Sequence, residues 1–185
     1  MGKFSRKIGA LIYYSFAKFL PPSFSGIQIG QRAIRAFCGK LMLKNCGKKV
    51  NIEKGATFSA KVSLGDYSGI GMNSRINGDC SIGDYVMMGS DVVVITRNHA
   101  FDRTDIPMMH QGFEEEHPVI IGNDVWIAAN VTICGGVTVG NGSVIGAGSV
   151  VTRDIPEGVL AAGNPCRVIR EITDEDSIYL KSKRD

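Results

Sequence analysis

The first fifty residues of this chain contain no aspartate or glutamate. The same segment carries ten lysine or arginine residues, whereas residues 51–185 carry eleven of these against eighteen acidic residues. The overall charge of +3 therefore hides a basic first quarter attached to an acidic body. This asymmetry favours an anionic partner for the N-terminal segment, either a membrane surface or an acidic neighbouring protein surface.

The chain also lacks an N-terminal hydrophobic run long enough to cross a bilayer. The apolar stretch over residues 8–20 spans thirteen residues and is interrupted by Lys18, whereas a spanning helix needs about 20 residues. No Ala-x-Ala-type cleavage site follows, and Arg6 breaks the pattern for N-terminal myristoylation. We expect a cytoplasmic protein whose basic segment, residues 1–49, is a candidate for contact with the inner face of the membrane.

Cysteine is too sparse and too scattered for a disulfide framework. The five cysteines, an odd number, include no Cys-x-x-Cys pair, which favours reduced thiols. Cys80 occupies a repeat position that elsewhere holds valine or serine, so we expect it to pack as a small apolar residue. No phosphate-binding glycine loop opens a predicted helix. We expect no nucleic-acid partner and no required metal.

What the chain does have is a six-residue period of apolar residues that breaks once and then resumes. The two series are Ile52, Phe58, Leu64, Ile70, Ile76, Ile82, Met88 and Val94, then Ile121, Ile127, Ile133, Val139, Ile145 and Val151. A period of six fits neither an α-helix nor a coiled-coil heptad. It is typical of a parallel β-helix, in which three hexapeptides form one triangular coil and the coils stack.

Two further positions of the hexapeptide support this interpretation. Small or β-branched residues such as Ser68, Val86 and Val131 stand four positions after the apolar residue and suit a narrow interior. Glycine directly follows the apolar residue in seven repeats, where we expect a corner with a φ value closed to most residues. These glycines are Gly65, Gly71, Gly83, Gly89, Gly122, Gly140 and Gly146.

The sequence predicts three parts. Residues 1–49 form a basic amphipathic segment with helices over 4–20 and 31–43. Residues 50–172 form an all-β domain of stacked hexapeptide coils. Residues 173–185 form a C-terminal helix and tail, in which Thr173 and Asp176 resemble a capping box before a short helix over about 174–182. The N-terminal helices either pack against the body or a neighbouring subunit, or lie on an anionic membrane face.

The interruption of the period contains every histidine of the chain. The gap is 27 residues long, which is not a multiple of six, so residues 95–120 must leave the β-helix as a loop and rejoin it. His99, His110 and His117 all lie in this loop. A loop of this length is either functional or a tolerated surface insertion. Histidine is the side chain best suited to proton transfer near neutral pH.

The loop and the coils after it resemble the hexapeptide-repeat acyltransferases. The resemblance rests on Thr96-Arg97-Asn98-His99-Ala100-Phe101, Asn123-Asp124-Val125-Trp126-Ile127-Ala128-Ala129, Ile145-Gly146-Ala147-Gly148 and Gly163-Asn164-Pro165-Cys166-Arg167. It covers about residues 60–172 and leaves residues 1–50 outside. The sequence is most similar to sugar O-acetyltransferases such as the galactoside, maltose and capsular-polysaccharide enzymes, and its loop resembles the surface-polysaccharide branch.

This resemblance implies a left-handed parallel β-helix that assembles as a homotrimer, with acetyl-CoA bound in clefts between adjacent subunits. It implies an O-acetyltransferase that uses acetyl-CoA and a sugar hydroxyl, for which a lipid-linked precursor of a surface polysaccharide is one candidate. The family's catalytic histidine corresponds to His99, which would act as general base. His110 and His117 correspond to no family position, and we expect them to be exposed.

The resemblance also implies a set of cofactor-binding positions. Trp126 corresponds to a tryptophan beside the thiol end of the cofactor, although its ring could also simply pack where the chain rejoins the helix. Ala129 and Ala147 correspond to the wall of the pantetheine groove, where small side chains let the cofactor lie close. The positions near the adenine and the phosphates are Thr152, Arg153, Arg167 and Arg170, and guanidinium groups suit phosphate.

Acceptor binding is less well marked in the sequence. Asn73 corresponds to a sugar-contacting asparagine of the family, and Asp102 is a second candidate for substrate binding. Asp102 or the acidic run Glu114-Glu115-Glu116 could also orient His99, or form a solvated face of the loop.

Three other functions stay open at this level. Related enzymes acetylate amines, such as amino sugars and antibiotics. β-Helical carbonic anhydrases share the fold but bind zinc through histidines at coil positions, whereas no histidine of this chain lies on a repeat. A non-catalytic β-helix that scaffolds a partner is the third.

Overall fold

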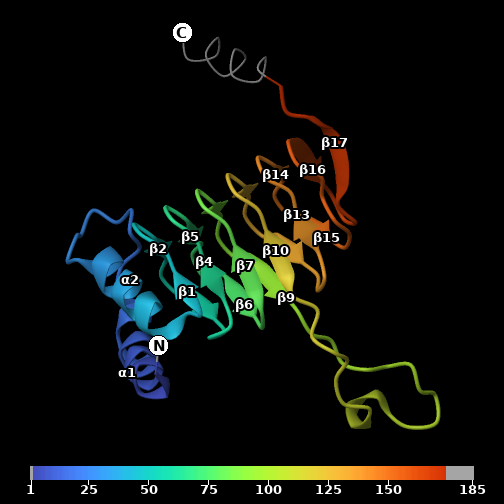
Figure 1. The fold of residues 1–185 in the computed structure, drawn as a ribbon, viewed down its shortest axis with the longest axis horizontal. Helices are drawn as coiled ribbons and strands as arrows, with labels where there is room; N and C mark the ends of the chain where they lie inside the picture. Colours follow the sequence, from blue (N-terminus) through green and yellow to red (C-terminus); the bar gives the residue numbers. More distant parts are fainter. Residues whose placement is uncertain (1, 174–185) are drawn as a thin grey trace.

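The computed structural model describes residues 2–173 and has the form of a β-helix whose first coils are covered by two α-helices (Figure 1). These helices are α1 (Lys3–Ser15) and α2 (Gln31–Met42), with a short 3-10 helix η1 (Ala17–Phe19) between them. Both predicted N-terminal helices are therefore present, and α1 is shorter than expected. The C-terminal helix predicted over about 174–182 lies outside the described residues.

The strands are two to five residues long, and from β1 to β15 successive strands fall on successive faces of the β-helix. They are β1 (Asn45–Cys46), β2 (Asn51–Ile52), β3 (Thr57–Phe58), β4 (Ser63–Leu64), β5 (Gly69–Ile70), β6 (Arg75–Asn77), β7 (Cys80–Ile82), β8 (Met87–Met88), β9 (Val93–Ile95), β10 (Val119–Ile121), β11 (Trp126–Ile127), β12 (Thr132–Ile133), β13 (Thr138–Val139), β14 (Val144–Ile145), β15 (Val150–Val151), β16 (Val159–Ala162) and β17 (Arg167–Glu171).

Three faces enclose the core, and we name each by its first strand. The β1 face contains β1, β4, β7, β10 and β13, and the β3 face contains β3, β6, β9, β12 and β15. The β2 face contains β2 and β5, continues with β8, β11, β14 and β16, and ends with β17. Within the faces the strands pair in parallel, except that β17 runs antiparallel to β16. This antiparallel end was not predicted from the sequence.

The apolar period marks the core, as predicted. Every residue of the two series is buried except Met88, which is half-buried. The small residues four positions later are buried as well, and the serines among them link neighbouring coils. Ser68, for example, donates to the carbonyl of Gly83 at 2.6 Å and accepts from the amide of Val86 at 2.9 Å. A buried hydroxyl is thus fully paired inside an otherwise apolar core.

The glycines after the apolar residues serve a different purpose from the one predicted. None of the seven has a positive φ value; that conformation falls two residues later, at positions such as Tyr67, Asn73 and Asp124. A Cβ atom built on Gly71 would lie 1.7 Å from the carbonyl oxygen of Gly89 in the next coil. The prediction of a special φ value was wrong, because glycine is needed there for the close approach of stacked coils.

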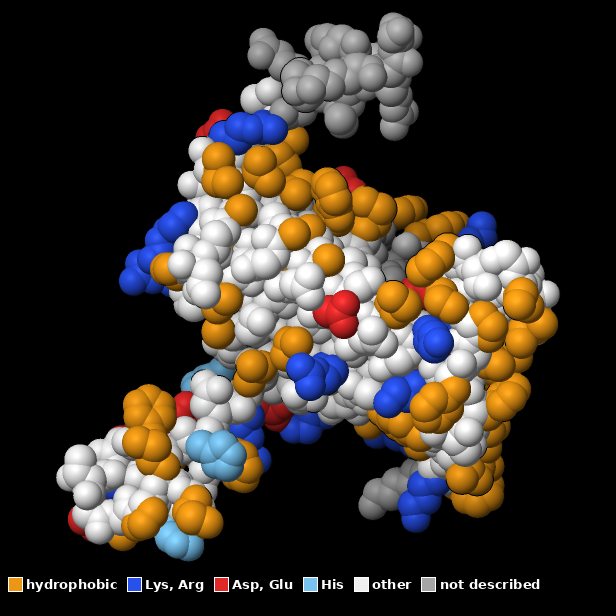
Figure 2. Space-filling model, turned by 180° about the vertical axis from the view of Figure 1, so that it is seen from behind, with side chains coloured by type: hydrophobic (Ala, Val, Ile, Leu, Met, Phe, Trp, Pro, Cys, Tyr) orange, Lys and Arg blue, Asp and Glu red, His pale blue; other side chains and the backbone are white. Residues whose placement is uncertain are grey.

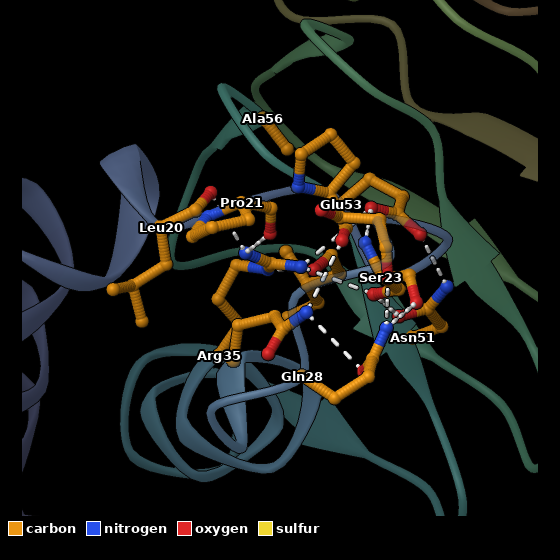
Figure 3. Close-up of polar contacts among 12 residues, drawn as sticks. Leu20, Pro21, Ser23, Gln28, Arg35, Asn51, Glu53 and Ala56 are labelled. Atoms are coloured by element: carbon orange, nitrogen blue, oxygen red, sulfur yellow. Dashed lines mark hydrogen bonds and ion pairs between the residues drawn. The ribbon is translucent and has the colours of Figure 1, made fainter.

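A buried arginine fastens α2 to the first coil (Figure 3). The guanidinium group of Arg35 donates to the carbonyl oxygens of Ile52 and Pro21 and to the hydroxyl of Ser23, and it lies 3.6 Å from the carboxylate of Glu53. A buried charge is tolerated only when it is paired in this way. The N-terminal helices therefore pack on the body, as one of the two predicted arrangements required.

The long loop leaves the β-helix without disturbing the order of its strands. It begins after β9 on the β3 face and ends at β10 on the β1 face, where the next strand would stand in any case. The segment between protrudes from the body (Figure 1). The predicted extruded loop is present, but it is shorter than the predicted 95–120, because Ile95 ends β9 and β10 begins at Val119.

Candidate active site

His99 lies exposed on the protruding loop, and its ring is held from one side only. Its main chain forms an isolated antiparallel bridge with Phe113, and the two rings stack with centroids 4.2 Å apart. The Nδ1 atom lies 3.2 Å from the carbonyl oxygen of Gly112. A carbonyl oxygen only accepts hydrogen bonds, so in the neutral ring Nδ1 carries the proton and Nε2 keeps its lone pair.

No carboxylate of the described residues bonds to this ring. Asp102 is exposed and forms no hydrogen bond there, and Glu116 is engaged at the base of the loop. Glu116 accepts from the amide of Asp79 at 2.7 Å and from the hydroxyl of Thr96 at 3.0 Å, and it pairs with Lys61. The Lys61 ammonium and these donors lower the pKa of Glu116 to about 2. Glu116 thus ties the loop to the body.

The other two histidines are exposed on the same loop, as expected. His110 ends a short 3-10 helix, η2 (Met108–His110). His117 lies at the loop base, where its carbonyl oxygen accepts from the amide of Gly136 at 3.0 Å. The loop therefore carries all three imidazoles (Figure 2), and the ring of His99 is oriented by its contact with the Gly112 carbonyl oxygen.

Three of the candidate positions share one edge of the β-helix, between the β2 and β3 faces, which we call the Ala147 edge. Asn73, Ala129 and Ala147 lie on it in successive order along the axis. Backbone hydrogen bonds join the coils there, including one of 3.0 Å from the amide of Gly148 to the carbonyl of Ala129. The two alanines, one coil apart, place only methyl groups at this edge, where Ala129 is half-buried and Ala147 is exposed.

Trp126 lies beside this edge on the outer side of the β2 face. It is 49% exposed and stands in register between Met87 and Val144 of the neighbouring strands. The indole ring therefore does not belong to the core, and half of it is open to a ligand or a partner. Met87 was not identified from the sequence as a neighbour of Trp126. Its place in the repeat, one coil before Trp126, would have predicted that the two residues lie side by side.

The remaining candidates lie elsewhere on the molecule. Thr152 and Arg153 follow β15 at the edge between the β3 and β1 faces, the same edge from which the loop departs. We call this the loop edge. Arg167 and Arg170 belong to β17, which ends the β2 face, and their guanidinium groups bond to the carbonyls of Cys166 and Glu171. All four side chains are exposed.

The candidate positions of one chain therefore fall mainly into two separated groups, which we call half-sites. The Ala147 edge with Trp126 is one, and the loop edge with His99 is the other; the β3 face lies between them. Within residues 2–173, no group of three or more His, Cys, Asp or Glu side chains could hold a metal ion. The five cysteines carry no disulfide, and burial raises the pKa of the Cys80 thiol to about 12.

These features define a class: a β-helix of hexapeptide coils with a histidine-bearing excursion loop, as in acyltransferases. The family model described as bacterial transferase hexapeptide (six repeats) matches residues 118–153. The galactoside O-acetyltransferase of Escherichia coli is 43% identical over 145 residues, which cover 76% of this chain and 70% of that protein.

Solved structures agree with this assignment. A galactoside acetyltransferase in complex with coenzyme A superposes with a TM-score of 0.76 at 33% identity, over 94% of this chain and 84% of that one. A maltose O-acetyltransferase from Clostridium difficile superposes with a TM-score of 0.75 at 30% identity, over 92% and 88% of the two chains. The chain belongs to the hexapeptide-repeat acetyltransferases and has their left-handed parallel β-helix.

Proposed function

We propose that this acetyltransferase transfers an acetyl group from acetyl-CoA to a sugar hydroxyl and that His99 is its general base. The observation that carries the proposal is the orientation of the His99 ring, whose Nδ1 faces the Gly112 carbonyl and whose Nε2 is left to accept a proton. The galactoside and maltose enzymes to which the chain is similar support the choice of a sugar acceptor.

The chemistry follows from this geometry. The acceptor oxygen attacks the carbonyl carbon of the thioester while Nε2 of His99 takes the hydroxyl proton. The tetrahedral intermediate then collapses, the carbon–sulfur bond breaks, and the imidazolium returns the proton to the departing thiolate. The products are an acetylated sugar and free CoA, and the His99 ring is neutral again.

The Ala147 edge is the proposed track for the acyl donor. Ala129 and Ala147 leave room for a pantetheine arm close to the backbone, and Trp126 offers an apolar surface beside it. Thr152, Arg153, Arg167 and Arg170 are the proposed contacts for the adenine and phosphates, because guanidinium groups pair well with phosphate. Asn73, farther along the same edge, and Asp102 on the loop are proposed acceptor contacts.

The separation of the two half-sites favours a homotrimer as the active form. A contact between the loop edge of one copy and the Ala147 edge of the next uses two different surfaces, so repetition of the contact gives either a closed ring or an open filament, and we propose the closed ring. Three copies of a three-sided helix form the smallest such ring, and each contact would then contain one complete site. Light scattering on the purified protein should give a mass about three times that of the 19.9 kDa chain.

The proposal is tested with His99→Asn and two matched loop variants, His110→Asn and His117→Asn. Each protein is incubated with acetyl-CoA and a panel of galactosides, glucosides, amino sugars and glycolipid precursors, and CoA release and acetylated product are measured. We expect His99→Asn to lower kcat by roughly 10²–10⁴-fold, and the two control variants to stay near wild type.

The same panel separates the other functions. An undiminished rate for His99→Asn contradicts the general-base assignment. Acetylation of amino sugars alone identifies an N-acetyltransferase. A protein that releases no CoA with any acceptor is a non-catalytic member of the fold.

A further inference from the structure

The outward side of α1 is apolar, contrary to the usual pattern of a surface helix. Phe4, Ile8 and Leu11 follow one another at helical spacing and are 76%, 40% and 70% exposed. The opposite side of α1 contacts the body through Tyr13, whose hydroxyl donates to the Ala56 carbonyl at 2.9 Å. The helix therefore has apolar residues on both sides, although only one side is covered within this chain.

The exposed apolar surface extends beyond α1. Large hydrophobic side chains of the segments around it are also exposed, namely Phe16, Phe19, Phe24, Ile27, Ile29 and Phe37. Figure 2 shows hydrophobic side chains spread over the end of the molecule where the N-terminal helices cover the first coils, with basic ones among them. We call this surface the N-terminal end. An apolar surface of this kind marks a site of interaction.

The charged residues that the first fifty residues contribute to the N-terminal end are all basic. Residues 1–50 contain no acid, and Arg35 is their only described basic residue that is fully buried. The exposed or half-buried basic residues are Arg6, Lys7, Lys18, Arg32, Lys40, Lys44, Lys48 and Lys49. Aromatic and aliphatic side chains beside unopposed cations are the composition that binds anionic lipid interfaces.

We propose that the N-terminal end docks on an anionic lipid bilayer. Its apolar side chains would enter the headgroup region while its basic residues approach the lipid phosphates, which supplies the two signals that stable binding needs. A contact between two such ends in a twofold dimer would bring cations against cations, which disfavours a second copy as occupant. No helix of the described chain is long and apolar enough to span a bilayer, so α1 would lie in the interface.

Docking deepens the proposed function and rests on it for its biological meaning. A threefold ring presents its three N-terminal ends on the same side, so that three weak contacts act together. The active sites would then face acceptor sugars carried by lipids in the same bilayer. Binding of lipid itself does not depend on the chemistry at His99.

The test is flotation of the full chain with vesicles of phosphatidylcholine that contain phosphatidylglycerol, and with vesicles of phosphatidylcholine alone. We expect binding to the anionic vesicles only, weakened by salt. Phe4→Ser combined with Leu11→Ser should lower the bound fraction about tenfold. The matched control replaces two exposed apolar residues of later coils, Ile120→Ser and Ile169→Ser, and should bind as the wild type does.

Three results overturn the proposal. They are equal binding to neutral vesicles, wild-type binding by the Phe4/Leu11 variant, and a lipid-free assembly larger than a trimer that this variant dissolves. The last result would mean that the N-terminal end pairs with another copy. Acetylation of a soluble acceptor by the wild-type protein is measured in parallel. A protein that binds anionic vesicles but acetylates no acceptor refutes the enzymatic proposal alone. A protein that acetylates the acceptor but does not bind the vesicles refutes docking alone.

Discussion

At the scale of single residues, the stacking of the coils depends on the absence of side chains at a few positions. Gly65, Gly71 and Gly83 each face backbone or side-chain oxygen atoms of the next coil at distances that no Cβ atom could occupy. Since the backbone of these glycines is not in the left-handed region, the constraint lies in the spacing between coils. It is therefore a packing constraint, which substitution can test directly.

We predict that Gly71→Ala lowers the free energy of unfolding by about 1–3 kcal/mol, because the added methyl group overlaps the carbonyl of Gly89 and forces the coils apart. Gly26→Ala is the matched control, since a Cβ atom there meets nothing within 4 Å, and its effect should stay within about 0.5 kcal/mol. Urea denaturation measures both. Equal stability of the two variants would show that the coils can separate without cost.

The sequence predicted the inward residues well and the reason for its glycines poorly. A six-residue apolar period leaves no choice about which side chains point inward, so burial at Ile70 or Ile127 follows from the pattern. A glycine, in contrast, serves either a turn with positive φ or a close approach, and the period alone does not separate them. The positive φ values at Tyr67 and Tyr85 were hidden because tyrosine rarely adopts that conformation.

At the scale of elements, the junction between α2 and the first coil depends on a carboxylate. Burial raises the pKa of Glu53. Hydrogen bonds from Ser23 and Asn51, together with the charge of Arg35, lower it by more than burial raises it, so the pKa lies below the ordinary value. A carboxyl whose pKa is lower in the folded state stabilises the fold above its unfolded pKa and loses that contribution as the pH falls.

We predict that the wild type loses stability as the pH falls below about 4.3, the ordinary glutamate value, and that Glu53→Gln reduces this loss. At neutral pH the same variant should be less stable than wild type, because Arg35 then remains buried without its counter-charge. Urea denaturation between acidic and neutral pH measures both effects, and Glu115→Gln, an exposed position on the loop, is the control. An unchanged acid slope in Glu53→Gln would contradict the assignment.

The elements themselves were predictable to different degrees. The two N-terminal helices follow from apolar spacing and from a proline pair after residue 20, and the excursion loop follows from arithmetic on the period. The antiparallel β17 did not, since Arg167 to Glu171 keep no six-residue pattern and pair with β16 only through the tertiary fold. The same limit hid the anchoring of the loop base by Glu116, whose three partners are distant in sequence.

At the scale of the whole molecule, the two half-sites make a prediction about mixed assemblies. His99→Ala removes the proposed base on the loop edge, and Ala147→Arg fills the proposed donor track on the other edge, so each variant alone should be inactive. Co-refolded at equal amounts, they should recover about a quarter of wild-type activity, because about one contact in four then joins an intact loop to an intact Ala147 edge.

The measurement is the initial rate of CoA release by the mixture, compared with the two variants kept apart. Recovery after co-refolding but not after simple mixing of folded proteins would identify exchange of subunits as its cause. A mixture that stays inactive although mixed trimers form would mean that each chain contains its own complete site, contrary to the proposal.

Because the loop lies between two consecutive strands, its sequence can change without a change in the stacked coils. Since β9 and β10 occupy their places in the coil whether or not the intervening segment is long, residues between them can be lengthened, shortened or exchanged without a change of register. We therefore expect acceptor specificity in proteins of this architecture to change through substitutions in the loop between β9 and β10. The coils, which carry the proposed donor positions Ala129 and Ala147, can stay the same.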